Sequence, residues 1–202
     1  MLLAYQLVSN GVAVDVVERH HDFDREFRGE LVMPSALDFL SVLGVLPQLV
    51  STGDARLGVE RELYVGAGRR VYPPGARQVG AWISQSALLR LLHSACSRHA
   101  GYRTHFGLPV TAVDRDDHGN VTALVAGRAD DTVRFPGSLF VLCTGRGSAA
   151  RILGLDAQTY DAHADVLWLR FDFQDLPGLL PSNVQVHMFG RGRVLVQFQT
   201  SR

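Results

Sequence analysis

The residue with the clearest chemical potential in this sequence is Glu18, an acid that ends a strongly apolar stretch. The stretch begins at Gly11 and carries valines at positions 12, 14, 16 and 17, a density of β-branched residues typical of a buried strand. In dinucleotide-binding folds, a carboxylate at the tip of the second strand accepts hydrogen bonds from ribose hydroxyls. Glu18 is therefore a candidate ribose-binding residue. The alternative is an ordinary strand end at the protein surface.

Two other polar residues stand where they could contact a phosphate group. Arg28 is followed by Gly29, and a guanidinium beside a residue without a side chain can approach phosphate oxygens closely. Gln85 lies in the first turn of an expected helix, where free backbone N–H groups favour anions. The alternative for both residues is a solvated surface position, and for Gln85 the residue types favour that alternative.

No catalytic acid, base or metal ligand can be assigned from the residue types. His20 and His21 are adjacent, so their side chains diverge and do not form a metal-ligand pair. Four other residues could face a substrate, although packing and sheet surface are the commoner roles for such side chains. They are His163, Trp168, Arg170 and His187.

The elements that must position Glu18 are a helix and a strand at the start of the chain. Apolar residues at helical spacing predict a helix over residues 1–10, and Gly11 stands where a C-terminal cap glycine is expected. Helix, glycine, buried strand and acid form the back half of a βαβ unit. The ribose acid of such a unit follows its glycine-rich phosphate loop by about 20 residues. If Glu18 is that acid, the loop and the first strand are not part of this chain.

Further helices are expected where apolar stripes at helical spacing end near a glycine. They are 34–44, 46–50 and 84–100. Pro34 suits the first turn of the first of these helices, and Ser84 is a natural N-cap for the last. Glycines at positions 66 and 68 predict a hairpin within 56–73, and residues 73–80 are expected to form a loop.

Strand patterns dominate the second half of the chain. Four short strands predict a small antiparallel insert: 102–106, 110–115, 121–126 and 132–135. The apolar segment 138–143 predicts an interior parallel strand that opens on the glycine-rich turn at Gly145. From Asp165 the pattern alternates with a period of two, and strands at 184–189 and 194–199 predict a hairpin that begins an antiparallel sheet.

The composition limits the classes of function that this chain is expected to have. The chain has 202 residues, of which 47% are hydrophobic and 20% charged, and its 20 basic residues balance 20 acidic ones. This balance does not suggest the basic patch that a nucleic-acid or anionic-membrane partner requires. No apolar run approaches the roughly 18 residues of a membrane span, and no secretion signal is recognised. The two cysteines are therefore expected to be free thiols in a reducing cytoplasm.

Six segments, taken together and in order, resemble one family of flavoenzymes. They are LLAYQLVSNGVAVDVVERH, DREFRGE, PSALDFLSVLGVL, WISQSALLRLL, LFVLCTGRGSAARILGL and DVLWLRF. The family is that of the flavin-dependent aromatic hydroxylases, single-component FAD monooxygenases similar to p-hydroxybenzoate hydroxylase. The resemblance covers most of residues 1–175.

The resemblance implies a fold and a reaction. The fold class is α/β, with an FAD-binding Rossmann-like domain over residues 1–160 that lacks its first strand and carries a β insert near 102–135. Residues 161–202 would begin the antiparallel sheet of a substrate domain. Family members bind FAD, take electrons from NAD(P)H and insert one oxygen atom of O2 into an aromatic substrate. The implied partner is therefore a small aromatic molecule, with no nucleic acid and no membrane span.

Three residues match the adenosine end of the family's cofactor site. By the resemblance, Glu18 would bind the adenosine ribose, with Arg19 beside it. Val110, which opens the β insert, would offer backbone contacts near the adenine.

Three further residues match the phosphate end of that site. By the resemblance, Arg28 would face the pyrophosphate of FAD, and Gln85 would meet the ribityl or phosphate region. Gly145 would be the glycine of the family's Asp-Gly motif, although the residue before it is Thr144 rather than aspartate. Threonine keeps a hydroxyl but loses the charge, so the role of this motif with the reductant is open.

Two motifs of the family have no counterpart in this sequence: the GxGxxG loop and a later Gly-Asp motif that contacts the flavin. Family members begin with a strand, GxGxxG and a helix that can read GPAGMLLAYQL, which matches this chain from Met1 onward. Met1 is therefore expected to be an internal residue of a longer frame, and the chain alone is expected to bind FAD weakly or not at all. Two alternatives stand beside the hydroxylase: a non-catalytic remnant or fragment that needs a partner chain, and a nucleotide-binding module without redox chemistry.

Overall fold

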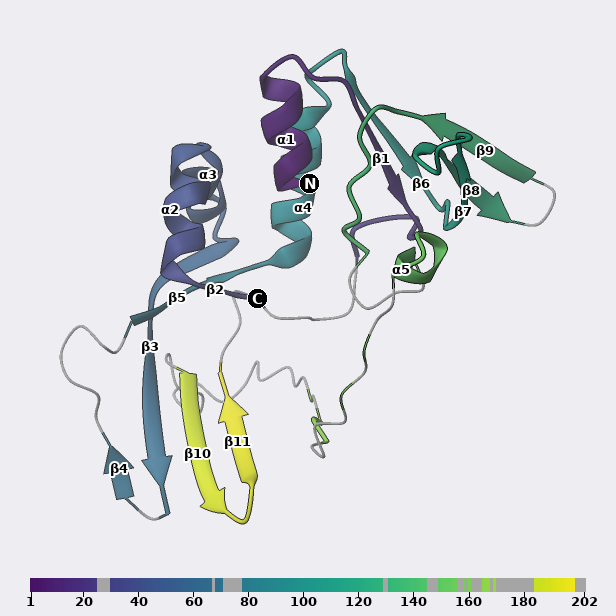
Figure 1. The fold of residues 1–202 in the computed structure, drawn as a ribbon. Helices are drawn as coiled ribbons and strands as arrows, with labels where there is room; N and C mark the ends of the chain where they lie inside the picture. Colours follow the sequence, from purple (N-terminus) through teal and green to yellow (C-terminus); the bar gives the residue numbers. More distant parts are fainter. Residues whose placement is uncertain are drawn as a thin grey trace. The chain divides into compact units, whose positions relative to one another are not determined.

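The chain folds into a mixed α/β protein with two compact units (Figure 1). The computed structural model describes residues 1–24, 30–66, 68–70, 78–128, 131–144, 149–155, 158, 160, 165–167, 169 and 184–198. Unit 1 contains Met1–Phe23 and Ala95–Leu169, and unit 2 contains Asp24–Ser94 and Arg170–Arg202. Each unit thus combines two separate stretches of the chain. The predicted domain boundary near residue 160 stays a prediction.

Unit 1 opens with the predicted succession of helix, glycine, strand and acid. Helix α1 spans Leu2–Ser9, and strand β1 spans Val14–Glu18. Between them, the Gly11 N–H donates to the Val8 carbonyl at 3.1 Å, which closes the last turn of the helix. Gly11 has a φ of +79°, a left-handed conformation that glycine adopts without steric cost.

Strand β1 pairs in parallel with β6, Tyr102–Phe106, and the two form a two-stranded sheet. An apolar cluster packs α1 against this pair: Ala4, Val8, Cys96 and Tyr102, with Val14 and Val16 beside them. The prediction that residues 102–106 belong to the antiparallel insert is therefore wrong. A helical crossover, completed by α4 (Gln85–Cys96), returns the chain so that β6 runs in the same direction as β1.

The antiparallel insert of unit 1 contains three strands. They are β7 (Val110–Arg115), β8 (Val121–Arg128) and β9 (Asp131–Pro136), in the order β7-β8-β9. A short helix, α5 (Ala149–Ile152), follows along the chain. The Arg115 guanidinium donates to the Leu153 carbonyl at 3.0 Å, which ties the end of α5 to β7.

The apolar segment 138–143 does not form the predicted interior strand. A strand needs a neighbouring strand that pairs its backbone groups, and none of the strands in the described part of unit 1 pairs with this segment. Its apolar side chains are consequently exposed: Leu139 at 76%, Val141 at 52% and Leu142 at 41%. Strand β1 likewise pairs with β6 alone among the described strands, so its other edge is open.

Unit 2 is built on a six-stranded sheet in the order β11-β10-β3-β5-β2, with β4 paired to β3. The strands are β2 (Leu31–Val32), β3 (Ala55–Val65), β4 (Gly68–Arg70), β5 (Gln78–Ile83), β10 (Val184–Gly190) and β11 (Arg193–Gln197). Helices α2 (Pro34–Val42) and α3 (Val45–Ser51) precede β3, as predicted. None of the described helices is by itself long and apolar enough to cross a membrane; α2 and α3 reach that length only as a pair bent by 99°.

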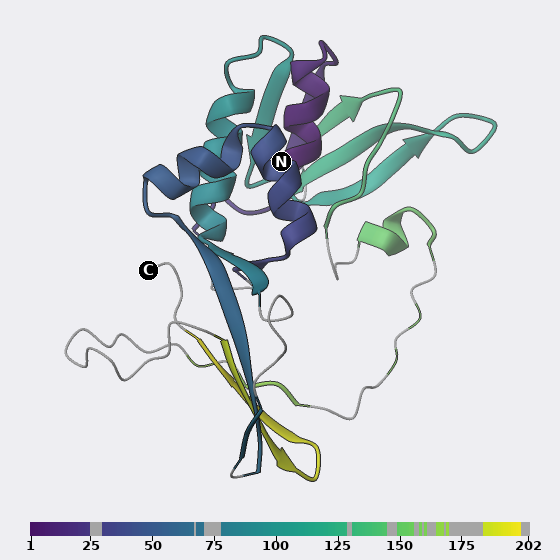
Figure 2. The ribbon, with the colours of Figure 1, turned by 90° about the vertical axis from the view of Figure 1, so that its left-hand side faces the viewer.

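Two strand predictions in unit 2 need correction. The segment 73–80 was expected to be a loop, but Gln78–Ile83 forms β5, which pairs with both β3 and β2. The hairpin of β10 and β11 was expected to begin a sheet of its own. Instead, β10 pairs in parallel with β3, and the yellow hairpin runs beside the long blue strand in Figure 2. Val184 of β10 packs into the same apolar cluster as Val59 and Trp82.

Candidate functional site

The candidate site lies where β1 and β6 end side by side. Beyond the strands, the Leu108 N–H donates to the Glu18 carbonyl at 3.0 Å, and the Gly107 N–H donates to the His20 carbonyl at 3.0 Å. These bonds continue the contact between the two chain segments past the strand ends. They bring Glu18 to the segment that leads directly into Val110, the first residue of β7. Val110, also predicted for the adenosine end, follows Leu108 by two residues along the chain.

The Glu18 side chain is half-buried and held in place by its own turn. Its Oε1 accepts a hydrogen bond from the His20 N–H at 3.0 Å. Strand alternation puts Glu18 on the same face as Val14 and Val16, which pack against α1. A carboxylate fixed at a strand end in this way can accept hydrogen bonds from a vicinal diol. The neighbouring Arg19 is exposed, and its Nε donates to His20 Nε2 at 3.2 Å.

The turn that follows Glu18 is packed firmly on the end of β6. The ring of Phe23, 8% exposed, meets the ring of Phe106 edge to face at 5.2 Å. The ring of His21 lies against Gly107, where a Cβ atom would come within 2.6 Å of the imidazole. Gly107 also has a φ of +73°, so both the space and the backbone favour glycine.

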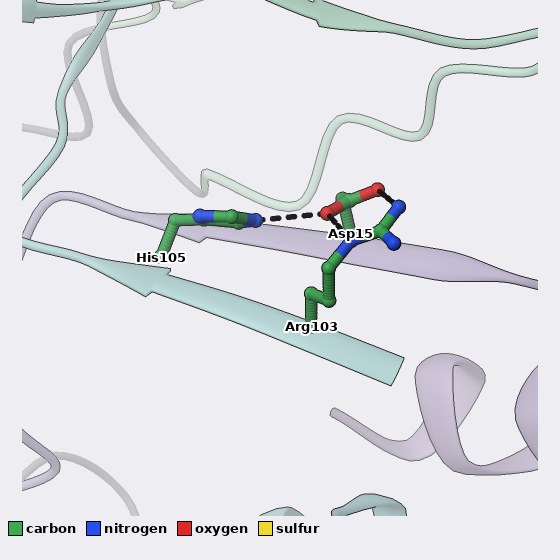
Figure 3. Close-up of polar contacts among 3 residues, drawn as sticks. All are labelled: Asp15, Arg103 and His105. Atoms are coloured by element: carbon green, nitrogen blue, oxygen red, sulfur yellow. Dashed lines mark hydrogen bonds and ion pairs between the residues drawn. The ribbon is translucent and has the colours of Figure 1, made fainter. Parts of the chain in front are cut away.

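The opposite face of β1 carries an ion cluster of Asp15, Arg103 and His105 (Figure 3). Arg103 donates to both carboxylate oxygens of Asp15, each at 2.9 Å, and His105 Nε2 lies 2.8 Å from Asp15 Oδ1. The hydrogen bond from Arg103, followed by that with His105, outweighs partial burial and lowers the pKa of Asp15 from 3.8 to about 2. The cluster therefore joins β1 to β6 on the face away from α1.

Replacing Asp15 with asparagine should lower stability at neutral pH by about 1 kcal/mol or less, because Arg103 is largely exposed and the pair is screened. The folded-state pKa lies below the unfolded one, so the contribution is present above about pH 4 and is lost as the pH falls toward 2. Urea unfolding of both proteins checks this. The difference between wild type and variant should shrink between about pH 5 and about pH 2.5; a constant difference contradicts the assignment.

The other residues predicted for the site lie elsewhere. Gln85 is the exposed first residue of α4, in unit 2, and Ser84 caps that helix through its Oγ, which accepts the Ala87 N–H at 3.3 Å. The helix start is therefore as predicted, and the ligand role of Gln85 stays a prediction. Arg28 and Gly145 lie outside the described residues.

The ion cluster of Asp15, Arg103 and His105 was not predicted from the sequence. Asp15 is an acid in a run of valines, and Arg103 and His105 alternate with Tyr102 and Thr104 in a strand of the same length. Polar residues at a period of two in β6, together with the acid Asp15 within β1, indicate a polar face on each strand. Combining these residues into one cluster requires knowing that the two strands are neighbours.

A second polar cluster lies on one face of the sheet in unit 2. Gln197 donates to Gln185 at 2.8 Å, Gln185 donates to Glu62 at 3.1 Å, and the Tyr64 hydroxyl donates to Glu62 at 2.9 Å. On the same face, the ring of His187 stacks on Tyr64 with centroids 4.5 Å apart. His187 is thus partly a packing residue, as expected, and His163, Trp168 and Arg170 lie outside the described residues.

Comparison with known proteins matches this architecture to a described family. The family model for an FAD binding domain matches residues 1–190. Among curated proteins, the 6-methylpretetramide 4-monooxygenase of Streptomyces rimosus is 28% identical over 183 residues, which cover 84% of this chain and 42% of the relative.

Solved structures share the fold. A variant of PqsL from P. aeruginosa superposes with a TM-score of 0.77 at 19% identity, over 98% of this chain and 54% of PqsL. PqsL in complex with 2-aminobenzoylacetate superposes with a TM-score of 0.69 at 20% identity, over 92% of this chain and 50% of PqsL. At these identities the likeness concerns the fold alone. The chain spans about half the length of the proteins it matches, or less.

Proposed function

The chain belongs to the FAD binding domain family, and on that premise we propose that it forms the adenosine-binding part and the first substrate-sheet strands of an FAD-dependent monooxygenase. The family that the sequence motifs indicated is thereby confirmed. The observation that carries the proposal is the placement of Glu18 at the end of β1. Its carboxylate accepts the His20 N–H, and its backbone carbonyl accepts the Leu108 N–H.

The residues present fit the adenosine half of FAD. Glu18 offers a fixed carboxylate for the ribose hydroxyls, and a charge-assisted hydrogen bond of this kind is stronger than a neutral one. We propose that Val110, at the start of β7, contacts the edge of the adenine through its backbone. Gly107 keeps this corner free of a side chain, because a Cβ atom there would meet the ring of His21. Arg19 is exposed next to Glu18 and can approach the same ribose.

The phosphate half of the cofactor calls for more than the described residues offer. We infer that the flavin-binding unit includes a further strand beside β1, with a glycine-rich loop that supplies backbone donors to the pyrophosphate. Two observations support this inference. One edge of β1 pairs with none of the described strands, and the apolar side chains of segment 138–143 are exposed. The same observations support the second candidate, a fragment that a partner chain completes. Arg28, Gln85 and Gly145 stay proposals for this half.

The reaction we propose is the insertion of one oxygen atom of O2 into an aromatic substrate, with the other oxygen leaving as water and NAD(P)H as reductant. FAD, when bound, supplies the oxygen chemistry, and the protein positions the cofactor and excludes water. The Streptomyces relative is a monooxygenase, and PqsL binds the aromatic 2-aminobenzoylacetate, and both facts support this reaction class. In unit 2, the face with Tyr64 and His187 offers stacked rings beside amide groups, which suits a planar substrate with polar substituents. A cytoplasmic location is part of the proposal.

A titration with three nucleotides tests the proposal on the chain as it stands. FAD should bind with a Kd weaker than about 10 μM, because the phosphate loop is not part of the chain. ADP should compete with FAD, and FMN should not, because the contacts described are those of the adenosine half. Flavin fluorescence reports the binding. Equal competition by FMN would overturn the adenosine assignment, and a sample that stays yellow through gel filtration would overturn the need for a further strand and loop.

A further inference from the structure

The ion cluster of Asp15, Arg103 and His105 makes none of the proposed cofactor contacts, yet it joins the two strands that end at the site (Figure 3). We propose that this ion cluster is a positioning device that fixes the alignment of β1 with β6. Through that alignment it holds Glu18 beside the turn at Gly107. The consequence for nucleotide binding rests on the proposed function, whereas the alignment itself does not.

The geometry of the ion cluster suits this role. In the pairing of the two strands, Asp15 lies opposite Arg103, and His105 lies opposite Val17. The Asp15 carboxylate therefore contacts both Arg103, its direct partner, and His105, the next residue on the same face of β6. Arg103 binds both oxygens of Asp15 in a planar fork, an arrangement that tolerates little displacement. The side chains of Asp15 and His105 are partly exposed, at 26% and 28%.

The apolar face that packs on α1 favours one alignment of β1 with β6, and the ion cluster favours the same alignment from the opposite face. The sheet has two strands with five paired residues each, and its other face is an apolar pattern with a period of two. A shift of one residue would move Arg103 and His105 to the face opposite Asp15 and leave all three charges without partners. The open edge of β1 adds no pairing from another described strand. The ion cluster thus adds a polar contact that is specific for this alignment to the apolar packing on the other face.

The ion cluster lies close to the groups that it would position. Asp15 precedes Glu18 by three residues in β1. In β6, His105 immediately precedes Phe106, the residue that pairs with Glu18. The ring of His105 also packs on Phe135 of β9, with centroids 4.5 Å apart. The same side chain therefore touches the β7–β9 sheet, whose first strand begins at the proposed adenine contact.

Native-state hydrogen exchange of the 202-residue chain tests the proposal without any ligand. Three amides report on the site: those of Gly107 and Leu108, whose bonds join the two strand ends, and that of His20, which donates to the Glu18 side chain. In Asp15→Asn these three site amides should exchange up to about fivefold faster than in wild type, while amides of β8 should stay within about twofold of their wild-type rates. The matched control is Asp114→Asn, which removes a 2.6 Å ion pair with Arg134 between β7 and β9. In the control the site amides should keep their wild-type rates.

The outcomes separate positioning from simple stabilisation. Uniform acceleration of the site amides and the β8 amides in Asp15→Asn would mean that the ion cluster only stabilises unit 1, and would overturn the proposal. So would acceleration of the site amides in the Asp114→Asn control. If Asp15→Asn fails to fold, Arg103→Lys is the second variant: it keeps the charge, loses the fork and should accelerate the same three amides.

The test also keeps the two proposals apart. ADP titration of the same samples should show weaker binding in Asp15→Asn than in wild type and unchanged binding in Asp114→Asn. If wild type binds no ADP, the proposed function fails while the exchange result still decides the alignment. If ADP affinity is unchanged in Asp15→Asn although the site amides are accelerated, alignment of the strands does not control the site, and the positioning role is refuted.

Discussion

Replacing Gly80 with alanine should unfold the six-stranded sheet of unit 2. Gly80 lies in β5 between β3 and β2, with a φ of +132°, which side-chain-bearing residues rarely adopt. A Cβ atom there would fall inside the contact radius of the Val32 carbonyl oxygen, a backbone atom that cannot rotate away. We expect a loss of about 3–5 kcal/mol, which is a large part of the stability of a small domain.

The measurement is urea unfolding followed by tryptophan fluorescence, since Trp82 is 2% exposed in the apolar cluster beside Gly80. Gly53→Ala is the matched control. Gly53 has a φ of +75° in the same unit, but nothing lies within 4 Å of its Cβ position, so only about 1 kcal/mol of backbone strain is expected. Equal unfolding midpoints for the two variants would contradict the close approach of β5 and β2.

Replacing Glu18 with glutamine should weaken binding of FAD and ADP by about 10- to 100-fold. The proposed contact is a charged acceptor for ribose hydroxyls, and hydrogen bonds to charged groups contribute about 1.5–3 kcal/mol. Glutamine keeps one acceptor for the His20 N–H, so the turn should keep its shape while the charge is lost. The effect should therefore appear in affinity and not in stability.

Calorimetric titration with ADP, combined with thermal unfolding, separates these two quantities. Asp117→Asn is the control, because Asp117 is an exposed acid in the turn between β7 and β8. That variant removes the same charge from unit 1 and should leave the ADP affinity within about twofold of wild type. Similar losses in both variants would attribute the effect to net charge rather than to the ribose contact.

Local patterns carried most of the successful predictions. The helix at the start, its Gly11 cap and the strand that ends at Glu18 follow from residues within a few positions of one another. The hairpin of β10 and β11 is confirmed for the same reason, because its turn residues stand between its strands. Strand partners distant in sequence could not be predicted in this way. Neither the parallel pairing of β6 with β1 nor that of β10 with β3 leaves a local signature.

The candidate site shows the same division. Glu18 could be predicted from its own strand, and the resemblance added Val110, whose role at the site stays a prediction. The contacts of Asp15 could not be predicted, because an acid in a short strand is usually a surface residue. Its two partners also lie about 90 positions further along the chain. The segment 138–143 failed as a strand because a strand is defined by its neighbour as much as by its own residues.

The parallel pairing of β3 with β10 has a consequence for the order of folding during synthesis. Residues in contact across these strands, such as Glu62 and Gln185, are 123 positions apart. Until Gln185 leaves the ribosome, that edge of β3 has no partner and the apolar surface around Val59 stays partly uncovered. Pairings of such high sequence separation form slowly, and the waiting chain is prone to aggregation. We therefore expect unit 2 to complete its fold after synthesis and its yield to depend on chaperones that shield nascent chains.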